Sequence, residues 1–178
     1  MKIIKTKFKD LLIIQNKNFR DRRGYFKELY KEKLFNKKFP FIVMSYSKKN
    51  VLRGMHIQKN KQQGKYVSVI KGKIFDVVVD LRKNSKTFGE HFTIILSEKN
   101  CKSLFIPAGF AHGFCSLGVE NYVTYACTKY RDKKSENGIM YNDKKLKIKW
   151  PIKNPIISNK DKKNMSYYQY LNKKNEKK

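Results

Sequence analysis

The sequence is poor in the residues that build disulfide frameworks and metal clusters. It holds three cysteines and three histidines in 178 residues. Cys101, Cys115 and Cys127 are widely spaced and form no Cys-x-x-Cys pair. An odd number of cysteines with such spacing is typical of neither a disulfide scaffold nor a zinc knuckle. We therefore expect three buried thiols in a reducing cytoplasm.

Long apolar runs are also missing. A membrane-spanning helix needs about 20 consecutive apolar residues, and no segment approaches that length. The first residues, Met1–Ile14, interleave lysines with apolar residues, which is wrong for a secretory signal peptide. The sequence predicts a cytoplasmic protein without a membrane partner.

Acidic residues are scarce beside basic ones, with 14 Asp and Glu against 42 Lys and Arg and a formal charge of +28. Such an excess invites a nucleic-acid-binding interpretation. However, groove-reading proteins favour clustered arginine for its bidentate fork, whereas here the excess is lysine spread over almost every loop. We therefore expect no nucleic-acid partner, and a positive field that favours encounter with anionic small molecules.

Helical periodicity is almost absent, and short apolar-alternating segments separated by turn residues take its place. These patterns predict many short strands, and hence an all-β barrel or jelly roll. No repeat or linker divides residues 1–178, so we expect one domain. Short helices are predicted near 31–40 and 161–171, with a frayed tail over 173–178. The expected strands are 11–15, Phe41–Ser47, Tyr66–Val69, Lys73–Arg82, His91–Leu96, Ser103–Ile106, Phe114–Leu117 and Asn121–Tyr130.

Charged residues stand within extended apolar segments between Val51 and Arg82. Charges are rarely placed in core strands unless they have partners or a task. His56 is the leading candidate, because Leu52, Met55 and Ile57 surround it instead of a lysine-rich loop. Taken alone, the same run also suits a core histidine that a backbone group satisfies.

Period-two counting assigns side chains to faces. In 73–82, Asp76 shares its face with Ile74 and Val78, whereas the opposite face is wholly apolar. Asp76 therefore lies either in a ligand cavity or on a solvated outer face. In the preceding strand His56 and Gln58 share a face, and Arg53 lies at an odd offset. For Arg53 and His56 to reach one site, Gly54 must bend or bulge the strand.

The motifs VLRGMH, QGK, FDVVVDLR, SKTFG and IPAGFAHGF follow one another along the chain. Through them the chain resembles the dTDP-4-dehydrorhamnose 3,5-epimerase family over nearly its full length, from DRRGYFKE to SNKD at 158–161. This resemblance implies a cupin-like jelly-roll fold and an isomerase that inverts C3, C5 or both in a nucleoside-diphosphate 4-keto-6-deoxy sugar, without metal or other cofactor. It also implies a homodimer, whose N-terminal segment completes the neighbouring site.

The resemblance also implies roles for individual residues. The base is His56, supported by Asp161, with Tyr125 as the acid on the opposite face of the sugar and Lys65 at its carbonyl. Asp76 is the rival partner for His56. The matching substrate contacts are Arg23, Glu28, Arg53, His112, Glu136 and Lys160, with Gln58 and Phe26 as further candidates.

The chemistry accounts for these residue types. Epimerisation beside a ketone removes a carbon-bound proton to give an enolate and returns a proton from the other side. Such a base needs a pKa near neutrality, which suits histidine, and a carboxylate behind it fixes the imidazole tautomer. A cation at the ketone oxygen stabilises the enolate, an effect typically worth ~10²–10³ in rate.

Two departures from the family pattern leave alternatives open. The segment VMSYS, 43–47, replaces a QDNHS-like strand that contributes nucleotide contacts, so a GDP- or CDP-linked sugar stays possible, as does C3-only epimerisation. Phe105 replaces a tryptophan. A more distant alternative is a metal-dependent cupin oxygenase. Against it, Gly54 and Gln58 stand where a cupin His-x-His pair requires histidine, and His91 is isolated.

Overall fold

Two sheets form the body of the protein. The computed structural model describes residues 1–175. The first sheet has six antiparallel strands, in the order β1 (Lys2–Lys5), β2 (Leu12–Gln15), β10 (Lys102–Ile106), β7 (Lys65–Lys71), β12 (Glu120–Cys127) and β5 (Phe41–Lys48). The second has the order β13 (Glu136–Gly138), β6 (Val51–Gln58), β11 (Phe110–Ser116), β8 (Lys73–Asp80) and β9 (His91–Ser97).

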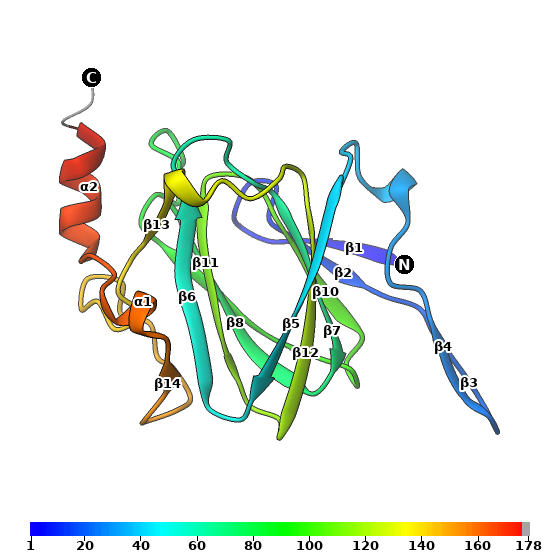
Figure 1. Ribbon diagram of the computed structural model, residues 1–178. Coiled ribbons are helices and arrows are strands. Elements are labelled where there is room, and N and C mark those ends of the chain that lie inside the picture. Colours follow the sequence, from blue (N-terminus) through cyan, green and yellow to red (C-terminus); the bar gives the residue numbers. More distant parts are fainter. Residues whose placement is uncertain (176–178) are drawn as a thin grey trace.

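Strands distant in the sequence therefore lie side by side, and the two sheets face each other as a barrel (Figure 1). This all-β, cupin-like jelly roll confirms the expected fold class. The short β14 (Ile156–Ile157) adds in parallel to β6. It brings the C-terminal part of the chain alongside the strand that carries His56.

The smaller elements lie outside the barrel. A separate hairpin, β3 (Asn18–Asp21) with β4 (Gly24–Lys27), projects on one side, and α2 lies on the other (Figure 1). The helices are η1 (Glu32–Leu34), η2 (Lys133–Ser135), α1 (Asn159–Lys162) and α2 (Tyr167–Asn175). None of the helices described is long and apolar enough to cross a membrane.

Part of the space between the sheets is filled by side chains that alternate along the strands. Val67, Val69, Ile74, Val78 and Phe114 are all within 2% of full burial and belong to one apolar cluster. Burial of such side chains contributes roughly 1.5–3 kcal/mol each. One end of the barrel therefore forms a packed core that holds the strands of both sheets in place.

The outer face of the second sheet is covered by the C-terminal part of the chain. Val77 and Val79 of β8 belong to an apolar cluster with Leu146, Tyr170 and Ile139. This explains the wholly apolar face of the 73–82 segment: it is the outer face, packed under α2. Asp76, on the alternate face, is fully buried inside the barrel.

Gly54 bends β6 as expected. Its φ of +127° suits glycine, and the β6–β11 register shifts between His112 and Phe114. A Cβ on Gly54 would lie 2.6 Å from the Cα of Gly113. Two glycines therefore let the strands approach closely, and the shift turns Arg53 and His56 toward one cavity.

Several boundaries differ from the expected ones. β11 runs from Phe110 to Ser116 and so begins earlier than the expected 114–117, because pairing with β8 starts directly after Gly109. The expected C-terminal helix is divided into α1 and α2. The tail expected to fray, 173–178, falls partly on α2, and 176–178 lie outside the described residues.

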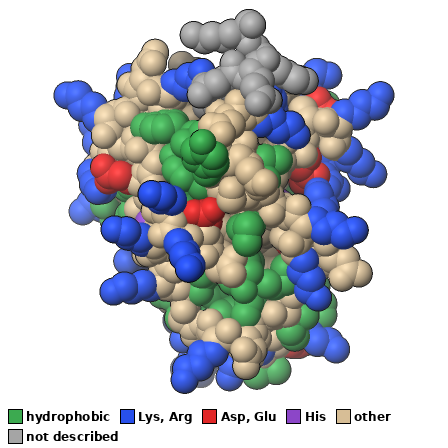
Figure 2. All heavy atoms as spheres, turned by 90° about the vertical axis from the view of Figure 1, so that its left-hand side faces the viewer, with side chains coloured by type: hydrophobic (Ala, Val, Ile, Leu, Met, Phe, Trp, Pro, Cys, Tyr) green, Lys and Arg blue, Asp and Glu red, His purple; other side chains and the backbone are tan. Residues whose placement is uncertain are grey.

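Lys and Arg side chains are distributed around the outline of the α2 face instead of forming a stripe (Figure 2).

Candidate active site

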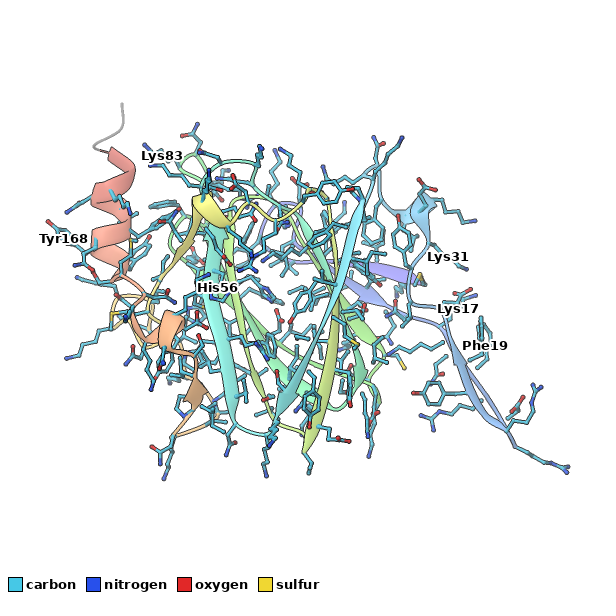
Figure 3. All side chains as sticks on the ribbon, in the orientation of Figure 1. Lys17, Phe19, Lys31, His56, Lys83 and Tyr168 are labelled. Carbon is cyan, nitrogen blue, oxygen red and sulfur yellow. The ribbon has the colours of Figure 1, made fainter. Side chains whose placement is uncertain are left out.

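A cavity of about 680 Å³ opens between the two sheets. Its walls bring together most of the polar residues expected to form the site. His56 points from β6 toward the interior of the barrel (Figure 3). The expected site residues that line the cavity are Arg53, His56, Gln58, Lys65, His112, Tyr125, Glu136, Lys160 and Asp161.

His56 is paired with a carboxylate from the C-terminal part of the chain. Its Nε2 lies 2.6 Å from Oδ1 of Asp161, whose Oδ2 accepts a hydrogen bond from the backbone N–H of Gly54 at 3.2 Å. Ser158 caps α1 by accepting from the backbone N–H of Asp161. Burial raises the pKa of Asp161, but the hydrogen bond with His56 and its charge outweigh burial and lower it. Asp161 is therefore an ionised partner that orients the imidazole.

A second histidine–carboxylate pair lies deeper in the wall. Nε2 of His112 lies 2.8 Å from Oδ2 of Asp76, and both side chains are at most 5% exposed. His112 is directly opposite His56 in the β6–β11 register. Asp76 is thus inside the barrel, where it binds His112 and not His56.

The opposite sheet contributes Lys65 and Tyr125 to the same cavity. Burial lowers the pKa of Lys65 and raises that of Tyr125. The phenol of Tyr125 lies 3.0 Å from the hydroxyl of Ser45, and its ring meets the His112 ring edge-on at 6.3 Å. A substrate in the cavity would therefore have His56 on one side and Tyr125 on the other.

Charged groups gather at the cavity wall near α1. Glu136 accepts hydrogen bonds at 2.7 Å from both Arg131 and Lys160. Burial raises the pKa of Glu136, and these two cations outweigh it and hold the pKa below its ordinary value. Gln58 accepts from the backbone N–H of Asp132. The cavity thus has a charged, hydrogen-bonded side that suits a phosphate-bearing ligand.

Arg53 stands at another part of the wall. Its guanidinium donates to the Ser47 hydroxyl at 3.0 Å and to the Tyr46 carbonyl at 2.9 Å. Both partners belong to the end of β5, which the 49–50 turn joins to β6. These bonds fix the guanidinium while leaving the side chain in the cavity lining.

Three candidates do not reach this cavity within one chain. Arg23, Phe26 and Glu28 belong to the projecting β3–β4 hairpin or its base, and none lines the cavity. Arg23 is exposed and donates to Asp21 at 2.6 Å, while Glu28 pairs with Lys31 at 2.6 Å. Figure 3 shows Lys17 and Phe19 of the same region standing away from the barrel.

Among the lining residues that the sequence did not single out, Ser45 and Arg131 make hydrogen bonds to expected site residues. Ser45 belongs to the departing segment 43–47, where its position on an alternating strand with Val43 and Ser47 was the available signal. Arg131 lies after β12, between Lys129 and the pair Lys133 and Lys134, and gave no signal that distinguished it from these lysines. The sequence around these residues does not reveal the hydrogen bond between Ser45 and Tyr125 or the one between Arg131 and Glu136.

The donor set favours proton transfer over metal binding. Within residues 1–175, no group of three or more His, Cys, Asp or Glu side chains is placed to hold a metal ion. Each cavity histidine instead directs Nε2 at a carboxylate. Proton transfer beside a carbonyl requires a base that removes the proton, an acid that returns one, and a positive charge that stabilises the enolate oxygen. The oriented imidazole, the phenol and the buried ammonium that face this cavity are groups of these three kinds.

Comparison with known proteins places this site in a family. The family model of dTDP-4-dehydrorhamnose 3,5-epimerase matches residues 5–169. A dTDP-4-dehydrorhamnose 3,5-epimerase of Shigella flexneri is 44% identical over 168 residues, 90% of this chain and 93% of that protein.

Two solved structures are similar over most of the chain. The epimerase of Legionella pneumophila in complex with dTDP-4-keto-L-rhamnose is 40% identical, with a TM-score of 0.89 and coverage of 93% of this chain and 92% of that one. A dTDP-4-dehydrorhamnose 3,5-epimerase of Bacillus anthracis with TDP and PPi bound is also 40% identical, with a TM-score of 0.89 and coverage of 93% and 98%.

The fold and the site together define a cupin-like jelly-roll enzyme that carries out proton transfer. The chain belongs to the dTDP-4-dehydrorhamnose 3,5-epimerase family. The isomerase class expected from the sequence is thereby confirmed.

Proposed function

We propose that the protein inverts C3 and C5 of dTDP-4-dehydro-6-deoxyglucose to give dTDP-4-dehydrorhamnose. His56 removes the proton beside the ketone, Lys65 stabilises the enolate oxygen, and Tyr125 returns a proton to the opposite face. The observation that carries this proposal is the placement of His56 and Tyr125 on opposite sheets of one cavity. Asp161 keeps the imidazole oriented through both steps.

The dTDP-linked substrate is supported by the ligand of the Legionella relative and by the cations of the cavity. Arg53, Arg131 and Lys160 line it and offer partners for a diphosphate. GDP- and CDP-linked sugars, and inversion at C3 alone, are the competing reactions. Incubation with 4-keto-6-deoxy sugars on dTDP, GDP and CDP identifies the nucleotide, because only the accepted substrate is epimerised. Deuterium incorporation at C3 and C5 in heavy water shows whether one centre or both are inverted.

The two-sided mechanism is tested in heavy water. Tyr125→Phe keeps the ring and deletes the hydroxyl, so His56 still removes the proton and returns a deuteron from its own side. Exchange at C3, C5 or both should persist, while net inversion falls by ~10²–10⁴. Tyr141→Phe, which changes a phenol outside the cavity lining, is the control. Equal loss of exchange and inversion would show that Tyr125 serves binding or enolate formation instead.

We further propose a homodimer in which the hairpin of one copy completes the cavity of the other. Phe19 and Phe26 of the hairpin are 54% and 69% exposed, an apolar area that suits a protein partner. Arg23 and Glu28 then reach the neighbouring site that they do not reach within their own chain. A fully active monomer in sedimentation would overturn this assembly.

Complementation tests the shared site directly. Arg23→Ala removes a hairpin residue, and His56→Asn removes a residue of the cavity. If the hairpin is exchanged, each site combines Arg23 of one chain with His56 of the other. Mixed dimers would then have one doubly altered site and one unaltered site, so mixing two inactive proteins restores activity. Absence of restoration in verified mixed dimers would place Arg23 in its own chain's site.

The cytoplasmic location also remains a proposal. It is supported by Cys101, Cys115 and Cys127, which are buried and unpaired, as expected of a protein from a reducing compartment.

A further inference from the structure

Ser45 and Tyr125 are diagonal neighbours on adjacent strands. The β5–β12 register pairs Tyr125 with Val43 and Val123 with Ser45. A diagonal pair is within reach when one side chain is aromatic, and the two hydroxyl oxygens are 3.0 Å apart. Within the described residues, this is the hydrogen bond that the Tyr125 hydroxyl makes.

The surroundings make this contact consequential. Tyr125 lies against His112 with its ring in the cavity wall, and burial opposes ionisation of its phenol. The hydrogen bond with Ser45 is the largest influence in the opposite direction, followed by the charge of Arg53. Ser45 is thus the immediate neighbour able to compensate a negative charge on the phenol oxygen.

We propose that Ser45 is a positioning residue that directs the Tyr125 phenol at the substrate and stabilises the phenolate formed when Tyr125 gives up its proton. This inference rests on the proposed function, in which Tyr125 is the acid. In that step the O–H bond of Tyr125 breaks and a C–H bond forms with the electron pair of the enolate. The ketone is restored, and the phenolate accepts a hydrogen bond from the Ser45 hydroxyl until a water proton replaces the one lost.

Ser45→Ala should therefore have the same kind of effect as Tyr125→Phe, a loss of net inversion with exchange retained, but a smaller one. A hydrogen bond to a charged group is worth about 10- to 100-fold, so net inversion should fall by that factor. Exchange of the substrate proton in heavy water should change little, because His56 and Lys65 are untouched. Ser45→Thr keeps a hydroxyl at the same position and should restore most of the inversion rate.

Ser47→Ala is the matched contrast. Ser47 lies on the same strand and face, but its hydroxyl accepts from Arg53 and not from Tyr125. Its loss should raise KM and lower exchange and inversion together. If Ser45→Ala behaves in this way too, Ser45 contributes to binding and the proposal fails.

A double-mutant cycle tests whether the two hydroxyls act as a unit. If Ser45 acts through Tyr125, Ser45→Ala should cost almost nothing in a Tyr125→Phe background. Additive losses would mean that Ser45 acts independently, which overturns the proposal.

An activity-independent measurement separates this inference from the proposed function. Incorporated 3-fluorotyrosine brings phenol titration to lower pH, and the ¹⁹F signal absent from Tyr125→Phe identifies the residue. That signal should titrate at higher pH in Ser45→Ala than in the unaltered protein, with Ser45→Thr unchanged. Failure of Tyr125→Phe to reduce inversion would refute the acid role, whereas an unshifted ¹⁹F titration in Ser45→Ala would refute the role of Ser45.

Discussion

Asp161 binds the imidazole of His56 through one carboxylate oxygen and the backbone N–H of Gly54 through the other. One side chain therefore fixes both the imidazole that we propose as the base and the bend in β6 that directs it into the cavity. Because α1 carries Asp161 and its cap, the position of the base depends on the C-terminal part of the chain.

We expect His56→Asn to abolish turnover, with a loss of at least the ~10²–10⁴ attributed to a positioned base. The fold should remain, because the substitution removes no core packing. Asp161→Asn should reduce the rate less, since the imidazole stays but loses its orienting charge. Steady-state kinetics and thermal unfolding measure both. An active His56→Asn would assign the histidine a structural role, and a larger loss in Asp76→Asn would make Asp76 the functional carboxylate.

Lys65 should give the reaction an alkaline limit. Burial lowers the pKa of its ammonium, so the charge that stabilises the enolate is present at low pH and is lost as pH rises through this lowered value. Lys65→Met should cost ~10²–10³ in kcat. Lys65→Arg keeps a positive charge at all accessible pH values. Its activity should be lower than that of the unaltered protein, but that activity should no longer decline at high pH. An unchanged alkaline limb in Lys65→Arg would assign that decline to another group.

The strand framework was predictable because its signals are local. Alternation along 73–82 identified two faces, and the glycine in VLRGMH predicted the bend that the structure shows at Gly54. Alternation separates the two faces of a strand, but it does not show which part of the chain covers each face. The apolar face of β8 is the outer one, because the chain beyond residue 139 packs on it, and this placed Asp76 inside.

Pairings across the site required more than local pattern. His56 and Asp161 are 105 positions apart, and only the resemblance joined them. Ser45 and Arg131 act through contacts made by neighbouring strands and loops, which composition and spacing do not show. The hairpin residues Arg23 and Glu28 do not line the cavity of their own chain, so the role proposed for them requires a second copy.

Gly54→Ala should destabilise the protein by about 2–3 kcal/mol, from strained backbone and a clash with Gly113. Gly24→Ala is a matched control, because its φ of +134° is similar but no atom lies within 4 Å of the added Cβ. It should cost only the backbone term, about 1 kcal/mol. Chemical denaturation measures both. Equal losses would show that β6 and β11 separate easily and that close approach is not what requires glycine.

Asp80 offers a test of a buried charge away from the cavity. The carboxylate is fully buried and accepts hydrogen bonds from Arg82, Ser85 and Thr87. Burial alone would raise its pKa, but these donors outweigh burial and hold the pKa at about 2, below the ordinary 3.8. The stabilisation is therefore fully present well above the ordinary pKa of 3.8 and is lost progressively as pH falls below that value and through the lowered pKa of about 2.

Asp80→Asn should cost about 3 kcal/mol at neutral pH, because Arg82 is left without its charged partner. Asp21→Asn is the control, since Asp21 makes the same contacts with Arg23 two residues later but in solvent. Because both groups of that pair are exposed to solvent, Asp21→Asn should change stability far less than Asp80→Asn. Denaturation between pH 2 and 7 should show a shallower pH dependence below pH 4 for Asp80→Asn than for Asp21→Asn. Matching curves would mean that the loop from 81 to 90 is held by its backbone contacts and not by the Asp80 charge.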